Sequence, residues 1–291
     1  QGCRPFLLFW CAFGNPGHTM AKYTEKGEKM VKKGYFCLLM ALTLCVTGCD
    51  GTVEPDLSAY TAGNAEIPKE IWGKMDEETR QALVEEPKYV ALTFDDGPRA
   101  DTTSMLLNGL LERGAAATFF VIGEQVTGNE TLLLRMVAEG HQIGNHTYSH
   151  VRLLTAEKNT VIEEVQKTEV ILKNLLGERD FWLRPPYGLI DSQRAALIKT
   201  PMIYWSLDPE DWKLLDAAKV VDYVVGNVEP GDIILMHDFY PTSVDAALEI
   251  IDRLQAQGYT FVTVEELFRI QGVAPQTGVL YASPLQIRPV S

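Results

Sequence analysis

The sequence predicts an α/β protein built on parallel strands that are joined by helices. From Lys88 onward, compact apolar runs alternate with amphipathic segments, the order expected of repeated strand and helix units. The chain has 291 residues and is 46% hydrophobic, which is enough for a large core. Polar residues gather where apolar runs end, and βα proteins place their active sites there. Periodicity leaves open whether the strands close into a barrel or form an open doubly wound sheet.

Seven apolar runs are the expected strands, and helix signals fall between them. Asp101 is placed to cap a helix that Gly114 ends, and Thr263 with Glu266 has the spacing of a capping box. Apolar residues recur at helical spacing over 157–176, so this segment should lay one face on the sheet. The expected strands cover residues 89–94, 117–122, 142–144, 181–184, 202–206, 232–237 and 260–262.

Residues 1–49 have the pattern of upstream residues followed by an export signal. Lysines precede an apolar run over 35–46, which at about 12 residues is too short to span a bilayer as a helix. The run ends in a sequence that resembles a lipobox, so we expect cleavage before Cys49 and a lipid on its thiol. An ordinary signal peptide or a buried strand are the alternatives. Met20 or Met30 is the expected start.

The remaining chain is expected to hold one domain between two flanking segments. Residues 50–86 are expected to be a tether, polar and turn-rich over 50–65, that ends in a short acidic helix at about 76–86. Residues 87–270 form the predicted domain, and residues 271–291 are expected to be a C-terminal tail.

Charge and cysteine content exclude two classes of site. Lys and Arg number 26 against 39 Asp and Glu, a net charge of −13, which argues against a nucleic-acid partner. All five cysteines lie within the first 49 residues, so the rest of the chain can form neither a disulfide nor a thiolate metal site. A metal would have to bind oxygen and imidazole.

Two polar clusters suggest a metal centre. Asp95 and Asp96 end the first expected strand before a Gly-Pro turn, and neighbours on an extended segment point to opposite sides. On a helical turn, His146 and His150 would lie about 5 to 6 Å apart on one face and could share an ion with Asp96. Three protein ligands would leave the open position that a catalytic ion needs. A plain Asp-Gly turn and a solvated histidine pair are the alternatives.

Three further segments carry groups suited to acyl chemistry. In Arg184-Pro185-Pro186-Tyr187 the first free backbone donor after the prolines is that of Tyr187, which could serve an oxyanion. Arg184 could pair with a catalytic carboxylate and hold it ionised.

The last two segments contain an acid and a histidine. Asp211 beside His237 would raise the histidine pKa and keep it protonated as a general acid. Leu235 points the same way as His237 because the two lie two apart on a strand, and Trp212 follows Asp211. A core histidine and a tryptophan in plain packing are the alternatives.

In this order, the five segments resemble the NodB-homology domain of the polysaccharide deacetylases, carbohydrate esterase family 4. The resemblance covers about residues 87 to 270 and implies a distorted (β/α)7-type barrel forming a single catalytic domain. It implies a divalent ion, usually zinc, with Co²⁺, Mn²⁺ or Ni²⁺ as alternatives, on Asp96, His146 and His150. It also implies that Asp95 is the general base and that His237 protonates the leaving amine.

The same resemblance assigns the supporting residues and the substrate class. Arg184 would orient Asp95, Asp211 would tune His237, and the Tyr187 N–H would bind the oxyanion. Trp212 and Leu235 would enclose the acetyl methyl group.

The expected reaction is removal of the N-acetyl group from N-acetylglucosamine in a cell-surface polysaccharide. A lipid anchor in the cell envelope of a bacterium would favour peptidoglycan. Chitin oligomers, N-acetylmuramic acid and acetyl-xylan are alternative substrates, and a non-catalytic carbohydrate-binding protein is the rival from another class. The oligomeric state stays open.

Overall fold

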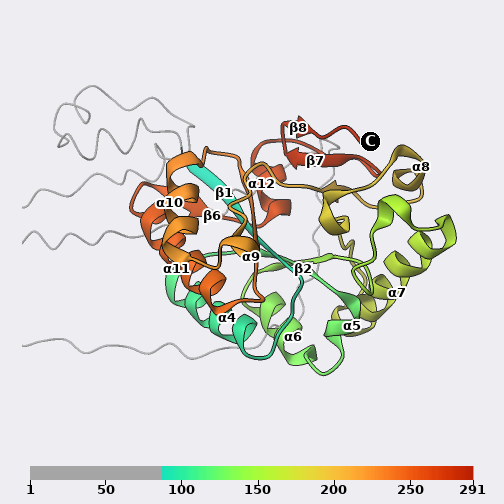
Figure 1. The fold of residues 1–291 in the computed structure, drawn as a ribbon, viewed down its shortest axis with the longest axis horizontal. Coiled ribbons are helices and arrows are strands. Elements are labelled where there is room, and N and C mark those ends of the chain that lie inside the picture. Colours follow the sequence, from blue (N-terminus) through green and yellow to red (C-terminus); the bar gives the residue numbers. More distant parts are fainter. Residues whose placement is uncertain (1–86, 291) are drawn as a thin grey trace, which may run out of the picture. The chain divides into compact units, whose positions relative to one another are not determined.

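The computed structural model describes residues 87–290 of the chain. The predicted signal peptide, Cys49, the tether and the acidic helix lie outside the described residues. In the described part, helices surround a group of parallel strands at whose centre β1 runs (Figure 1). No helix in this part combines the length and apolar content needed to cross a membrane.

The strands pair in a ring. β1 (Lys88–Asp95) pairs in parallel with β2 (Thr118–Val121) and with β5 (Ile233–His237), and β2 pairs with β3 (Gln142–Asn145). Isolated parallel bridges complete the circuit: Leu183 joins β3 to β4 (Met202–Ile203), and Leu207 joins the segment after β4 to β5. The pairing therefore closes into a distorted barrel, as the resemblance implied. The short β6 (Tyr259–Phe261) pairs with the start of β1.

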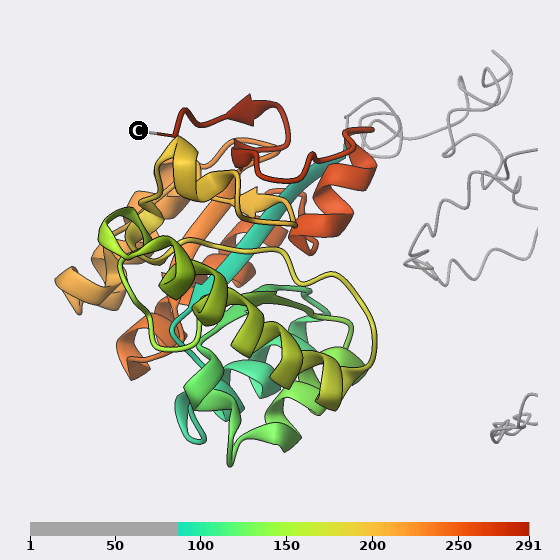
Figure 2. The ribbon, with the colours of Figure 1, turned by 90° about the vertical axis from the view of Figure 1, so that its right-hand side faces the viewer.

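Two segments differ from the sequence-based expectation. Residues 181–184 form no named strand and contribute only the bridges at Leu183, because Pro185 and Pro186 follow at once and have no N–H to extend a ladder. Part of the expected tail 271–291 is ordered as β7 (Leu280–Ser283) and β8 (Gln286–Ile287). β7 pairs in parallel with β4, so the C-terminal strands lie beside the segment that contains β4 (Figure 2).

Helices connect the strands and cover the outside of the barrel (Figure 1). Gly114, at φ 58°, ends the first of them as predicted, whereas Asp101 makes no side-chain cap bond. The predicted cap at Thr263 is present, since its hydroxyl accepts from the Glu266 N–H at 3.1 Å. The helices are α4 (Thr102–Arg113), α5 (Gly123–Val126), α6 (Glu130–Ala138), α7 (Lys158–Leu176), α8 (Ser192–Ala195), α9 (Asp211–Leu214), α10 (Ala217–Asn227), α11 (Pro241–Gln255) and α12 (Val264–Ile270), with 3-10 turns η1 (Leu153–Thr155) and η2 (Pro186–Gly188).

Alternation along β1 separates the hydrophobic core from the barrel interior. Val90, Leu92 and Phe94 are buried in the cluster that includes side chains of α4 and α11, and each such side chain contributes about 1.5 to 3 kcal/mol by leaving water. Thr93 and Asp95 point to the other face, because successive side chains on a strand alternate. Both are buried, and both reach Arg184. The strand thus fixes Asp95 at the end of a rigid element.

Candidate active site

A cleft of about 480 Å³ opens at the carboxyl ends of the strands. Asp95 is the last residue of β1 and His237 the last of β5, and the two are partners in the register of these strands. Since the ends of parallel strands lie at one edge of a sheet, residues far apart in sequence meet here. The cleft is lined by Asp95, Asp96, His146, His150, Tyr187, Trp205, Asp208, Trp212, Leu235, His237, Phe239 and Tyr240.

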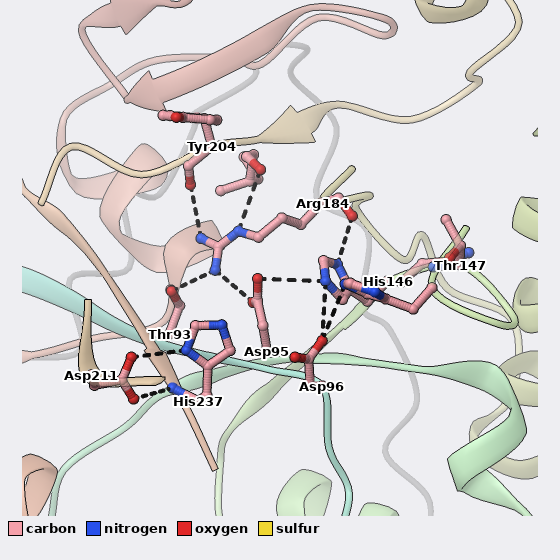
Figure 3. Close-up of polar contacts among 12 residues, drawn as sticks. Thr93, Asp95, Asp96, His146, Thr147, Arg184, Tyr204, Asp211 and His237 are labelled. Carbon is pink, nitrogen blue, oxygen red and sulfur yellow. Dashed lines mark hydrogen bonds and ion pairs between the residues drawn. The ribbon is translucent and has the colours of Figure 1, made fainter. Parts of the chain in front are cut away.

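Asp96, His146 and His150 form a cluster suited to a metal ion. Each offers one ligand atom, and these atoms lie within 4.8 Å of one another. Asp96 Oδ1 lies 3.5 Å from His146 Nε2 (Figure 3). It lies 3.4 Å from His150 Nε2 and is buried without a hydrogen-bond partner. A buried carboxylate oxygen that lacks a donor is costly unless a cation meets it. The donor set therefore fits a divalent ion with an open coordination position.

The two histidines converge from a loop, and the predicted helical turn is absent. Thr147 and His150 have positive φ values of 66° and 56°, which break any helix. Glu164 on α7 holds this loop: one carboxylate oxygen accepts from the Tyr148 and Ser149 N–H groups at 2.9 and 2.8 Å. The i,i+4 spacing identified the right pair of histidines, but the helical turn that it predicted is wrong.

His146 is held in the neutral form with one nitrogen free. Its Nδ1 lies 2.8 Å from the Arg184 carbonyl oxygen, which can only accept, so Nδ1 carries the proton and Nε2 has its lone pair available. Burial lowers the pKa of His146 to about 3, although Asp96 opposes the shift. A neutral imidazole whose other nitrogen donates to a carbonyl is the usual state of a metal ligand.

Asp95 lies beside the same histidine but is held by a different partner. The Arg184 guanidinium, completely buried in the barrel, donates to Asp95 Oδ1 and to Thr93 Oγ1, each at 2.7 Å (Figure 3). Burial raises the pKa of Asp95, and the charge of Arg184 opposes this rise. The expectation that Asp95 and Asp96 point to opposite sides does not hold: Asp96 has φ 72°, so it leaves the extended path and both carboxylates approach His146.

His237 is positioned by Asp211 through two bonds. Asp211 Oδ1 lies 2.8 Å from His237 Nδ1, and Oδ2 accepts from the His237 backbone N–H at 2.9 Å. Burial lowers the pKa of His237, but the bond and charge of Asp211 outweigh it and raise the pKa to about 9. The histidine is thus an imidazolium at neutral pH, with Nε2–H available to a substrate.

The remaining predicted residues line the cleft. Tyr187 has φ 61°, a left-handed conformation that costs energy for a non-glycine residue, and its backbone N–H has no acceptor within residues 87–290. Leu235 is buried on β5, and Trp212 at the start of α9 is 49% exposed. All three contribute to the cleft wall.

A family model described as "Polysaccharide deacetylase" matches residues 83–201. A peptidoglycan-N-acetylglucosamine deacetylase of Bacillus cereus is 35% identical over 190 residues, which cover 62% of this chain and 89% of that protein. The chain belongs to the polysaccharide deacetylase family. The peptidoglycan-N-acetylmuramic acid deacetylase PdaC of Bacillus subtilis is 40% identical over 184 residues, 63% of this chain and 39% of that protein. A structure of Bacillus subtilis PdaC matches with TM-score 0.63 and 40% identity, covering 64% of this chain and 93% of that one.

The match does not extend over whole relatives. This polysaccharide deacetylase-family chain spans about two fifths of the length of the first curated relatives that it matches. The family model, over residues 83–201, includes the segments that carry Asp95, Asp96, His146, His150 and Arg184.

Several residues of the deacetylase-family cleft were not found from the sequence. Thr93 accepts from Arg184 inside the barrel, and Glu164 holds the histidine loop from α7. Trp205, Asp208 and Phe239 line the cleft. Thr93 lies two residues before Asp95, and Asp208 lies three residues before Asp211. Their position near the ends of predicted strands could have indicated them. Nothing in the sequence indicates Glu164, because its role depends on how α7 packs.

Proposed function

We propose that this chain is a metal-dependent deacetylase that hydrolyses the N-acetyl group of N-acetylglucosamine residues in a cell-surface polysaccharide, releasing acetate. The observation that carries the proposal is the composition of the cleft. A three-ligand metal cluster, a buried carboxylate paired with an arginine, and a charged histidine meet at the ends of neighbouring strands. Amide hydrolysis needs these three functions: electrophilic activation, a general base and a general acid.

Asp96, His146 and His150 would hold the ion. We propose Zn²⁺, although a site with two histidines and one carboxylate also accepts Co²⁺, Mn²⁺ or Ni²⁺. When bound, such an ion supplies polarisation of the acetamide carbonyl and a lowered pKa for water. Asp96 Oδ1 and the free Nε2 of His146 are prepared for this role by their lack of competing hydrogen bonds.

Asp95 is the proposed general base. Its Oδ1 is occupied by Arg184, so its Oδ2, 3.7 Å from His146 Nε2, is the oxygen available to take a proton from the attacking water. Burial brings its pKa upward, which makes it a better proton acceptor near neutral pH, while Arg184 fixes its orientation. Arg184 is therefore a positioning residue.

His237 is the proposed general acid. The imidazolium can give its Nε2 proton to the nitrogen that leaves as the amine, and Asp211 stabilises the charge before the transfer. The Tyr187 N–H is proposed to bind the oxygen of the tetrahedral intermediate. Trp212 and Leu235 are proposed to enclose the acetyl methyl group, because they form apolar parts of the cleft wall.

Peptidoglycan is the proposed substrate. Deacetylases of peptidoglycan N-acetylglucosamine and of N-acetylmuramic acid are both among the relatives, which supports a cell-wall glycan. Chitin oligomers, N-acetylmuramic acid and acetyl-xylan remain the alternatives. A non-catalytic carbohydrate-binding protein is disfavoured, because Asp95, Asp96, His146, His150 and His237 are all present in one cleft.

We further propose that the chain works in the bacterial cell envelope, exported by the signal at residues 1–49 and anchored through a lipid on Cys49. The catalytic domain, proposed from the sequence for 87–270, would extend through β7 and β8. Replacing Cys49 by Ser should release the protein from the membrane fraction. Unchanged partition of this variant would contradict the lipid anchor.

Acetate release tests the proposed reaction. The protein starting at residue 50 is incubated with peptidoglycan and with chitin oligomers, before and after chelation and with zinc added back. We expect release that the chelator abolishes and zinc restores. A metal-loaded protein that releases acetate from neither substrate nor from acetyl-xylan would contradict the deacetylase proposal.

A further inference from the structure

The arginines of the described chain fall into two groups. Most of those on the surface bind a carboxylate, as in Arg253 with Glu249 at 2.8 Å and Arg269 with Glu266 at 2.9 Å. Arg152 and Arg288 bind none: within residues 87–290 neither side chain has an ion pair or hydrogen bond, and each lies over an aromatic ring. Arg179 also lacks a carboxylate, but it donates to the Leu176 carbonyl. In a chain with an excess of 13 negative charges, exposed guanidinium groups without a carboxylate stand out.

Both arginines lie over aromatic rings, one of which lines the cleft while the other stacks on a cleft residue. The Arg152 guanidinium carbon is 4.6 Å from the centre of the Tyr187 ring, and Tyr187 lies 4.7 Å from the ring of His150. The Arg288 guanidinium carbon is 3.7 Å from the centre of the Tyr204 ring. That ring stacks on Trp205, which lines the cleft, at 3.8 Å.

The two stacks belong to one side of the cleft. A side-chain carbon on Gly188, the residue after Tyr187, would lie 2.1 Å from the Tyr204 ring and 2.9 Å from Trp205. These rings therefore pack directly against the turn that carries Tyr187, with the Tyr204 carbonyl facing Arg184 (Figure 3). Arg288 is anchored by its backbone N–H, which donates to the Leu280 carbonyl of β7 at 2.8 Å.

A third arginine, Arg99, also lies over an aromatic ring of the cleft, but it has a carboxylate nearby. The Arg99 guanidinium carbon lies 4.1 Å from the ring of Phe239, another cleft residue, and the nearest carboxylate oxygen, on Asp101, is 3.9 Å away. A guanidinium whose face lies on a ring still has its N–H edge free, and that planar edge matches the two oxygens of a carboxylate.

We propose that the side of the cleft formed by Tyr187, Tyr204 and Trp205, with Arg152 and Arg288 over it, is a subsite for carboxylate groups of the glycan. The cleft would then select an anionic polysaccharide over neutral chitin or xylan. The inference rests on the proposed deacetylase function and narrows its substrate. Arg152 is two residues from the metal ligand His150, so a carboxylate on the reacting sugar or on the next one along the chain could meet it. Local cations also offset the repulsion that the net negative charge exerts on an anionic polymer.

In a glycan of alternating N-acetylglucosamine and N-acetylmuramic acid, the carboxylate has two sources. One is the lactyl group of muramic acid and the other is the peptide that the lactyl group carries. Glycan strands freed of peptide retain only the first. Comparing them with intact strands distinguishes the two sources.

The test compares a glycan with its neutral counterpart. Zinc-loaded protein is given peptide-free glycan strands and the same strands with the carboxylates converted to amides, and kcat/KM is measured for acetate release. We expect wild type to prefer the carboxylated strands by about tenfold, and the Arg152→Ala/Arg288→Ala protein to lose most of that preference through KM. The Arg152→Lys/Arg288→Lys protein should keep part of this preference, and added salt should reduce the preference in wild type.

The control is Arg179→Ala, an arginine without a carboxylate partner that lines a separate cavity around His141 and Lys199. This variant should keep the wild-type preference. Arg99 is left in place because its guanidinium already has a carboxylate, that of Asp101, at 3.9 Å.

Two outcomes would overturn the inference. One is equal kcat/KM on both strands in wild type, and the other is an unchanged preference in the double alanine variant. If neither strand releases acetate, binding of the two strands to the zinc-loaded Asp95→Asn protein is measured by calorimetry. A binding preference that disappears in the alanine variants would support the subsite while the deacetylase proposal fails, and equal binding would overturn the subsite as well.

Discussion

The proposed metal side and the proposed proton-transfer side of the cleft hold a buried and a partly buried histidine in opposite charge states. Burial lowers the pKa of His146 to about 3, and its Nδ1 meets a carbonyl oxygen. Burial also lowers the pKa of His237, but Asp211, 2.8 Å from its Nδ1, raises it to about 9. The partner of Nδ1 therefore decides the charge: a carbonyl leaves a neutral ligand, and a carboxylate makes a proton donor.

The largest expected effect comes from removing a metal ligand. The His146→Ala protein should lose its bound metal and at least about 10³-fold in kcat/KM, because electrophilic activation disappears. Metal analysis of the purified protein and an acetate assay provide the measurement. His141→Ala is the matched control, since His141 is also buried, with a pKa lowered to about 4, but lies outside the cleft. Metal content that stays unchanged in His146→Ala would remove this residue from the ligand set.

The next effect separates the base from the metal site. The Asp95→Asn protein should keep its metal and lose about 10² to 10⁴-fold in kcat, because the amide cannot accept the proton from water. Metal analysis and single-turnover rates measure the two properties independently. Turnover close to wild type would eliminate Asp95 as the base. Loss of metal would show that the two carboxylates share the ion.

The sequence predicted the strand ends and the residues on them, because both depend on local pattern. Alternation of apolar runs placed Asp95 and His237 at the ends of strands, and the structure pairs them in register. Local geometry was less predictable. The histidine loop depends on positive φ at Thr147 and His150 and on Glu164, which is brought there by the packing of α7.

The C-terminal segment shows the same limit. Residues 271–291 lack a long apolar run, so they were expected to be a tail, yet β7 pairs with β4. A four-residue strand gains its stability from the neighbour it pairs with, which the sequence does not reveal. The pairing also places Arg288 on the ring of Tyr204.

A smaller effect on rate but a clear effect on pH dependence is expected at Asp211. In wild type, kcat should fall as the pH rises through about 9, where His237 loses its proton. In Asp211→Asn the pKa of His237 should be lower, because the bond and charge of Asp211 no longer oppose the effect of burial. Asp95 and Asp96 still raise this pKa, and the charge of Asp208 also acts on the ring. The fall should then move toward the ordinary histidine pKa of about 6.5. A pH profile of kcat with the same basic limb in both proteins would contradict Asp211 as the partner that charges His237.

The free energy of unfolding should also depend on the protonation of His237. The folded pKa of His237 is above the ordinary value of about 6.5, so its contribution is complete below that pH and is lost as the pH rises toward 9. The difference in free energy of unfolding between wild type and Asp211→Asn should therefore shrink over this window. Urea titrations at several pH values measure it, and a difference that is constant from pH 6 to 9 would contradict the assignment.

The smallest expected effect tests how the metal side is held. Glu164 accepts from the backbone N–H groups of Tyr148 and Ser149 and from the Ser149 hydroxyl, and it does not touch the ion cluster. Its removal should let the loop between His146 and His150 move, because the loop contains left-handed residues that need support. We expect Glu164→Ala to weaken zinc affinity by about tenfold, as measured by chelator competition.

The Glu164→Gln protein can still accept the two N–H bonds, so its zinc affinity should lie between those of Glu164→Ala and wild type. The exposed neighbour Glu163, changed to Gln, is the control. Equal zinc affinity in all four proteins would show that burial of His146 alone orders the metal side, as the carboxylate of Asp211 orders the other.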